Sequence, residues 1–188
     1  MVKTAEEVYD FWFESGLGDK RRYSSPDFDK EIWDKFGATW QAAVQGLLSG
    51  WRKTARGRLS EIVVIDQFSR HLNRGSAKSY LYDPMAMVLA QELIALDEFS
   101  SFSPEEKHYT YLALMHIESA ALHEKLIRYY EEEEMADYLL FEQKHKALID
   151  AFGRYPHRNE VLNRESTTAE LVYLNQSGGK MFIEPSED

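Results

Sequence analysis

The chain contains no cysteine, which excludes disulfide scaffolds, zinc–thiolate sites, iron–sulfur centres and cysteine nucleophiles. Positive charge is also scarce. The 22 Lys and Arg side chains face 32 Asp and Glu side chains, which gives a formal net charge of −10. Proteins dedicated to nucleic acids hold the phosphates mainly with clustered positive charge, so this balance argues against nucleic acid as a partner.

Long hydrophobic runs are absent too. The clearest aliphatic run covers only residues 62–65, so we expect no membrane-spanning segment and no membrane partner. The first residues, MVKTAEEVYDFWF, lack the basic and then apolar pattern of a secretory signal, and we therefore expect a cytoplasmic protein. Apolar residues make up 44% of the 188 positions, which is enough for a sizeable core and favours one domain.

Proline occurs only five times, and three prolines follow a side chain that can cap a helix: Ser25-Pro26, Asp83-Pro84 and Ser103-Pro104. Three capping boxes are predicted, at Thr4 with Glu7, Ser103 with Glu106 and Thr167 with Glu170. Between these starts, apolar residues recur at helical spacing. The expected helices cover residues 4–14, 26–48, 55–71, 84–96, 104–115, 118–132, 137–152 and 168–175, with a short turn around 159–162.

This pattern predicts an all-α single domain of stacked antiparallel helix pairs over residues 1–176. Residues 177–188 are expected to form a flexible or loosely packed tail, and the loop at residues 16–25 to be mobile. Gly153 follows a predicted helix at the position where a left-handed residue is expected. The four glutamates at 131–134 are interpreted as a solvated helix end that frays, because they oppose the helix dipole.

The first candidate site lies in residues 66–74, within a segment of net charge +4 that covers residues 51–75. On a helix, Asp66, Arg70 and Arg74 share one face, and Gln67 adds an amide beside them. An aspartate in this arrangement can orient an arginine towards a carboxylate or phosphate. The alternative is an ordinary intrahelical ion pair that ties the helix to its neighbours.

The second candidate site is the stretch Gly153-Arg154-Tyr155-Pro156-His157-Arg158-Asn159, which places two arginines, a histidine and an amide in one loop. Backbone donors at a helix start together with guanidinium groups can bind an anion. The alternative is that Arg154, His157 and Arg158 bind the carbonyls left open at the end of the preceding helix.

The third candidate is the stretch His116-Ile117-Glu118, with His145 further along the chain. Residues two apart on one helix point in nearly opposite directions, so His116 and Glu118 can converge only where a helix ends, and we interpret this stretch as such a break. His145 lies in the apolar stripe of its helix and is expected to point inwards. No HExxH or comparable spacing occurs, so we expect no metal and no cofactor.

These motifs resemble an uncharacterised helical family, domain of unknown function 924, over nearly the whole chain. The similarity is carried by Phe11-Trp12-Phe13, Asp66-Gln67-Phe68 with Arg70 and Arg74-Gly75, Asp83, His116 with Glu118, His145, and residues 152–159 followed by Arg164 and Ser166-Thr167. The resemblance implies a tetratricopeptide-like helical array and no established activity. This chain departs from the family pattern at Ser69, His71, Ile117 and Asn163, the last standing where the family tends to have glycine.

Three functional hypotheses follow. The first is a binding module in which both arginine segments, His116, Glu118 and His145 line one polar pocket for a small anionic or carboxylate-bearing ligand. It predicts that residues 66–74 and 154–159 lie close together, with Asp66 and Glu118 as the acids that face four arginines, so that positive charge is left over for the ligand. The second is a hydrolase-type enzyme using His116 and Glu118 as an acid–base pair. The third is a protein-interaction scaffold. No sequence pattern indicates the oligomeric state.

Overall fold

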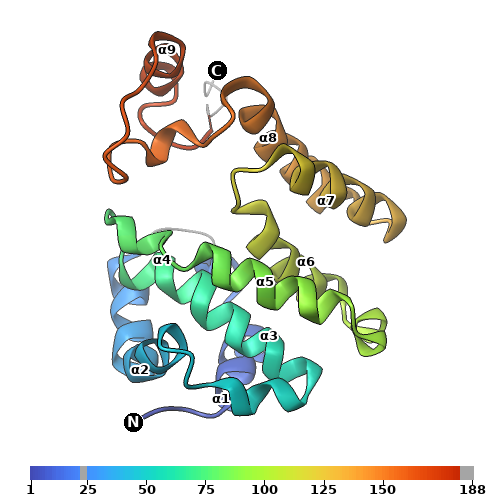
Figure 1. The fold of residues 1–188 in the computed structure, drawn as a ribbon. Helices are drawn as coiled ribbons and strands as arrows, with labels where there is room; N and C mark the ends of the chain where they lie inside the picture. Colours follow the sequence, from blue (N-terminus) through green and yellow to red (C-terminus); the bar gives the residue numbers. More distant parts are fainter. Residues whose placement is uncertain (22–24, 183–188) are drawn as a thin grey trace. The chain divides into compact units, whose positions relative to one another are not determined.

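The computed structural model describes residues 1–21 and 25–182, and within these residues every regular element is helical (Figure 1). The all-α prediction is therefore confirmed for the described chain. The chain divides into two compact units, Met1–His116 and Ile117–Asp188. The tetratricopeptide-like arrangement and the single-domain organisation stay predictions.

The described residues of the first unit form six α-helices, two of which are extended by a π-helical turn. They are α1 (Ala5–Tyr9, continued by the π-helical turn Asp10–Glu14), α2 (Pro26–Val44), α3 (Ala55–Val63, continued by the π-helical turn Val64–Phe68), α4 (Ser69–Leu72), α5 (Asp83–Ile94) and α6 (Pro104–Met115). Short 3-10 turns lie at Gly18–Arg21, Ser49–Lys53, Ala77–Ser79 and Asp97–Ser101. Residues 22–24 of the loop that was expected to be mobile lie outside the described residues.

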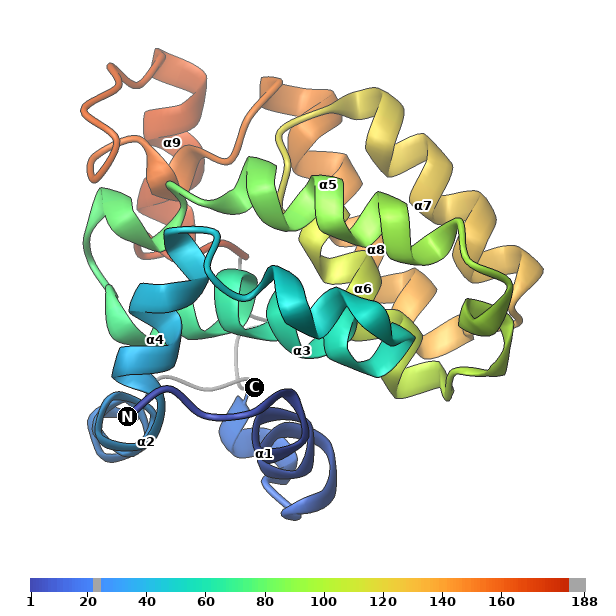
Figure 2. The ribbon, with the colours of Figure 1, turned by 60° about the horizontal axis from the view of Figure 1, so that its bottom comes forward.

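The continuous helical segment formed by α3, its π-helical turn and α4 lies at the centre of this unit. Helix α3 contacts α1 on one side and α5 and α6 on the other, as Figure 2 shows for α1 and α5. Burial on all sides explains why the aliphatic run at residues 62–65 sits in a helix and has no polar face. The π-helical turn inserts one extra residue per turn, and such insertions are frequent at functional sites.

Local capping chemistry sets most helix starts as predicted. All three capping boxes form, and the Ser25 hydroxyl accepts a hydrogen bond from the Phe28 backbone N–H. The prediction that Asp83 caps a helix is wrong. Helix α5 begins at Asp83 itself, and its N-cap residue Tyr82 makes no side-chain capping bond, because the Asp83 carboxylate is used by Arg70 instead.

The second unit is built on an antiparallel hairpin of α7 (Ala120–Glu132) and α8 (Ala136–Phe152), followed by a 3-10 turn at Pro156–Arg158 and by α9 (Thr168–Gln176). A hydrogen-bonded turn follows at residues 159–163, where the Leu162 backbone N–H donates to the Arg158 carbonyl, so the turn expected around 159–162 is confirmed. Gly153 has a φ of 69° after α8, as expected for a left-handed terminating residue.

Part of the expected tail contacts the core of the second unit. Leu148, Ile149 and Tyr155 form a buried cluster, against which the partly buried side chains of Met181 and Phe182 lie. The Tyr173 hydroxyl also donates to the Met181 carbonyl, at 2.8 Å. Residues 177–182 are thus held to the fold, and residues 183–188 lie outside the described residues.

Candidate functional site

Asp66 is the centre of a buried polar cluster in the first unit, and its carboxylate is completely inaccessible to solvent. Oδ1 meets His116 Nδ1 at 2.8 Å and Arg70 Nη1 at 2.9 Å, and Oδ2 accepts from the Gln67 amide at 2.6 Å. Arg70 also donates from Nη2 to Asp83 Oδ2 at 3.0 Å. We call these five residues the Asp66 cluster.

The protonation states in the Asp66 cluster follow from burial and from neighbouring charge. Burial alone would raise the pKa of Asp66, but Arg70 and His116 outweigh it and lower that pKa well below its usual range. Burial and the Arg70 charge lower the pKa of His116, although Asp66 partly opposes them. At neutral pH the cluster therefore holds an ionised carboxylate next to a neutral imidazole.

Arg74 does not join the Asp66 cluster, although sequence spacing placed it on the same face. Its Nε and Nη2 donate to the two oxygens of Asp29 in α2, at 2.8 and 2.9 Å. His71 meets the same carboxylate through Nδ1, at 2.7 Å. Helix α4 ends at Leu72, so the helical spacing does not extend to Arg74, and Asp29 presents both carboxylate oxygens to the guanidinium fork.

The break predicted between His116 and Glu118 is present, since α6 ends at Met115 and α7 begins at Ala120. Within the first unit, the carboxylate that meets the His116 ring is that of Asp66. The Glu118 oxygens accept from the Tyr155 backbone N–H at 2.7 Å and from Arg164 at 2.6 and 3.0 Å. The Asp66 carboxylate therefore holds one His116 tautomer, and the pairing of His116 with Glu118 stays a prediction.

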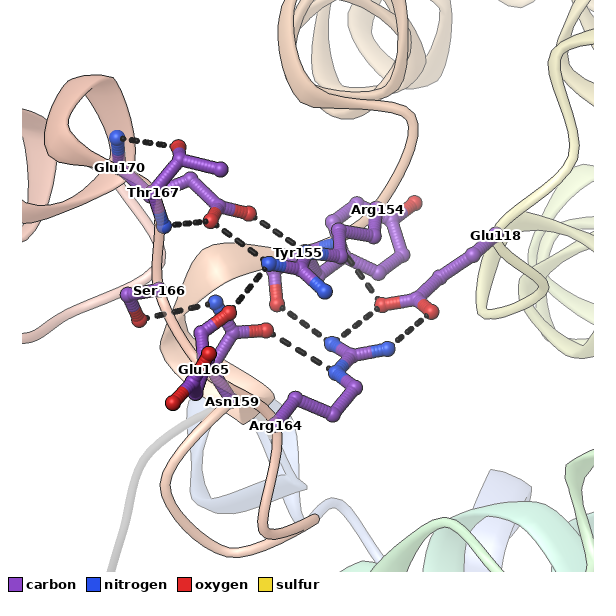
Figure 3. A network of polar contacts seen from close by, with 9 residues as sticks. All are labelled: Glu118, Arg154, Tyr155, Asn159, Arg164, Glu165, Ser166, Thr167 and Glu170. Atoms are coloured by element: carbon purple, nitrogen blue, oxygen red, sulfur yellow. Dashed lines mark hydrogen bonds and ion pairs between the residues drawn. The ribbon is translucent and has the colours of Figure 1, made fainter.

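Glu118 belongs to an extensive polar network in the second unit (Figure 3). Arg164 connects it to Asn159 Oδ1, which accepts from Nε at 2.9 Å, and to the Tyr155 carbonyl at 3.1 Å. The Asn159 amide in turn donates to the Ser166 hydroxyl. Arg164, which sequence reasoning noted only within the family resemblance, is thus the residue that fastens the loop after α8.

Arg154 is held by Glu170 at the start of α9. Its Nε and Nη2 lie 2.6 and 2.7 Å from the two carboxylate oxygens, and the same carboxylate accepts from the Thr167 backbone N–H (Figure 3). The hydrogen bond from Arg154 lowers the pKa of Glu170 to about 2, against the opposing effect of burial. Glu170 therefore serves the capping box and the ion pair together.

The remaining predicted site residues of the second unit lie against its core. His145 donates from Nδ1 to the Phe141 carbonyl at 2.8 Å, and its ring meets the edges of Tyr155 and Phe182. The buried Arg158 places its guanidinium 4.6 Å from the Tyr155 ring centre, and the His157 ring lies beside Tyr155. The inward direction expected for His145 is confirmed by its burial.

The count of two acids against four arginines, made from the sequence, is wrong. Three further carboxylates, those of Asp29, Asp83 and Glu170, contact these arginines. The Asp66 and Arg70 segment lies in the first unit and the 154–159 loop in the second, so their predicted proximity stays a prediction.

Two departures from the family pattern have a structural explanation. Asn163 has a φ of 51°, a left-handed conformation that glycine adopts freely and asparagine tolerates better than most residues. The Ser69 hydroxyl accepts from the Trp40 indole N–H at 2.9 Å.

A family model described as a bacterial protein of unknown function (DUF924) matches residues 8–178. The chain belongs to this family. A solved structure of a protein of unknown function from Agrobacterium tumefaciens is similar to this DUF924 chain, with a TM-score of 0.84 and 32% sequence identity over 90% of this chain and 96% of that one. No curated protein matches the chain. In the described part of this DUF924 protein, no helix has the length and apolar content needed to cross a bilayer, and no three metal-ligating side chains converge.

Proposed function

We propose that the first unit binds a small anionic or carboxylate-bearing ligand at the exposed edge of the Asp66 cluster. The observation that carries the proposal is that Arg70 and His116 converge on one buried carboxylate oxygen, while their side chains keep 18% and 13% of their surface exposed. A fully buried aspartate thus orients the Arg70 guanidinium and the His116 ring, whose Nε2 can donate to an anion once the ring is protonated. This is the arrangement in which an arginine fork recognises a carboxylate or phosphate.

The charge of the Asp66 cluster adds a condition to this proposal. With His116 neutral, Asp66 and Asp83 supply two negative charges and Arg70 one positive charge. An anion placed against Arg70 and His116 raises the pKa of His116 through its own charge, so its binding takes up a proton. The affinity for an anion should therefore increase as the pH falls.

The test is thermal unfolding in sulfate or in chloride at equal ionic strength, at pH 6 and pH 8. All four tryptophans lie in the first unit, so their fluorescence follows the unit that carries the site. We expect sulfate to raise the midpoint more than chloride does, by a larger margin at pH 6. Sulfate also strengthens burial generally, so the difference must be compared with that of variants.

Arg70→Gln removes the side chain that is proposed to bind the anion. Lys53→Gln is the control, because it removes one positive charge from an exposed position of the same unit. The proposal requires that the extra sulfate response disappears in Arg70→Gln and persists in Lys53→Gln. An equal response in both variants would reject anion binding at the Asp66 cluster.

A second candidate function is hydrolysis with His116 as general base. The 2.8 Å contact between Asp66 and His116 Nδ1, together with the lowered pKa of His116, favours it, because an ionised aspartate fixes the tautomer whose Nε2 accepts a proton. We expect turnover in an esterase, phosphatase and amidase screen to be lost in His116→Gln and to decline below the lowered pKa of His116.

Turnover that survives His116→Gln would exclude this mechanism. If Arg70→Gln and His116→Gln leave both sulfate binding and turnover unchanged, the ion pairs serve the fold alone. That outcome is the one required by the protein-interaction-scaffold hypothesis.

A further inference from the structure

A chain of three hydrogen-bonded side chains crosses the interior of the second unit. Glu142 Oε1 of α8 meets His123 Nδ1 of α7 at 2.6 Å, and His123 Nε2 meets the Tyr155 hydroxyl at 3.0 Å. All three residues are inaccessible to solvent. The chain therefore joins both helices of the hairpin to the loop that follows α8.

The buried carboxylate at the end of this chain is incompletely satisfied. Among the described residues, Glu142 Oε2 has no hydrogen-bond partner. Burial raises the pKa of Glu142, although His123 and Lys146 oppose the increase. One proton held between Glu142 and His123 makes the pair neutral overall, whereas its loss leaves a single negative charge in the interior, which is costly.

Other titratable groups lie near Glu142 and His123, but each has a different interaction partner. Lys146 lies one turn beyond Glu142 and binds Asp150, at 2.7 Å. His145 donates to a backbone carbonyl of its own helix, and Tyr130 of α7 stacks on Tyr138 of α8. Tyr155 is the connection to the rest of the unit, because its backbone N–H and carbonyl bind Glu118 and Arg164.

We propose that the Glu142–His123–Tyr155 chain is a pH-sensitive latch. It holds the loop at residues 154–158 against α7 and α8 while one proton is shared between Glu142 and His123, and it opens when that proton is lost in alkaline solution. Opening would expose Arg158, which is buried in the closed loop. A proton that the folded pair holds and the unfolded chain releases makes the folded unit less stable as the pH rises.

Amide hydrogen exchange of the full chain between pH 6.5 and 9 tests the latch. The backbone N–H groups of Gly153 and Arg158 are internal probes, because both are hydrogen-bonded within this region. After correction for intrinsic exchange rates, we expect their opening equilibrium to increase up to about tenfold per pH unit, the limit for release of one proton. Amides of the first unit provide the internal reference.

Glu142→Gln should abolish this dependence, because an amide carries no titrating proton, whereas Glu132→Gln at the exposed end of α7 should retain it. Tyr155→Phe keeps the ring and removes only the hydroxyl, which protects the test if Glu142→Gln fails to fold. In the Tyr155→Phe variant, the exchange of the α8 amides should still depend on pH, whereas the exchange of the Arg158 amide should no longer change with theirs. Exchange that is independent of pH in the native chain, or equally dependent in Glu142→Gln, would overturn the latch.

Discussion

Replacing Asp66 with asparagine removes the charge on which the Asp66 cluster depends. Breaking a buried ion pair by removing one partner costs about 3–5 kcal/mol, because the other charge stays buried without compensation. Arg70 keeps Asp83 at 3.0 Å, and the amide oxygen of asparagine can still accept one hydrogen bond. We therefore expect the lower end of the range, a loss of about 3 kcal/mol in the free energy of unfolding of the first unit.

Urea unfolding followed by tryptophan fluorescence measures this loss, since Trp12, Trp33, Trp40 and Trp51 all belong to the first unit. With an m-value of about 2 kcal/mol per molar urea, the midpoint should fall by about 1.5 M. Asp34→Asn is the matched control, because the carboxylate of Asp34 is exposed and pairs with Lys30 one turn away. Its cost should be at most about 1 kcal/mol.

A double-mutant cycle separates the ion pair from general damage to the core. Arg70→Met should destabilise the first unit as well, but Asp66→Asn and Arg70→Met together should cost less than the sum of the two, by at least about 1 kcal/mol. Additive effects, or an Asp66→Asn cost that equals that of Asp34→Asn, would refute the assignment of Asp66 as the centre of the cluster.

The pH dependence of the same variants has a defined sign. The pKa values of Asp66 and His116 are both lower in the folded unit than in the unfolded chain, so the unfolded chain binds more protons in acid. Their contribution is complete above about pH 6.5 and is lost as the pH falls, first through His116 and then, below about pH 4, through Asp66. Asp66→Asn should flatten the lower part of this profile.

Three further predictions concern the second unit and are measured by urea unfolding followed by far-UV circular dichroism. Gly153→Ala should cost about 1–2 kcal/mol because φ is 69°, whereas Gly50→Ala, with open space and no positive φ, should cost less. Asn163→Gly should be neutral or stabilising and Asn163→Ala destabilising, because φ is 51°. Glu170→Gln should cost about 2 kcal/mol at pH 7 and progressively less as the pH falls from 4.5 to 2, where the native carboxylate is itself protonated. Equal costs at pH 7 and pH 2 would contradict this last prediction.

The sequence was most informative where a structural feature depends on residues close together in the chain. A capping box needs two side chains three residues apart, and a glycine with positive φ needs only itself, so Thr167 with Glu170 and Gly153 could be read directly. The π-helical turn at Val64–Phe68 could not, because its residues have no distinct pattern and tertiary packing sets its geometry. The end of α4 at Leu72 could not be read either, and it ends the helical spacing that placed Arg74 beside Asp66.

The carboxylates that were missed show why the candidate site was harder to predict than the fold. Asp29 lies 45 residues before Arg74, and no local signal connects them. The sequence indicated that Asp83 and Glu170 each cap a helix. Because a cap is a contact within one helix, neither residue was considered as a partner of a distant arginine. In the structure Asp83 is the first residue of α5 and binds Arg70, and Glu170 Oε2 accepts both from the Thr167 backbone N–H and from Arg154. A carboxylate has about four acceptor positions, so a local role never excludes a distant one. When charges are counted from sequence, an Asp or Glu with a capping role in its own helix must therefore still be counted as a possible partner of every arginine. In this chain such a count removes most of the positive charge that the two arginine segments were expected to have in excess.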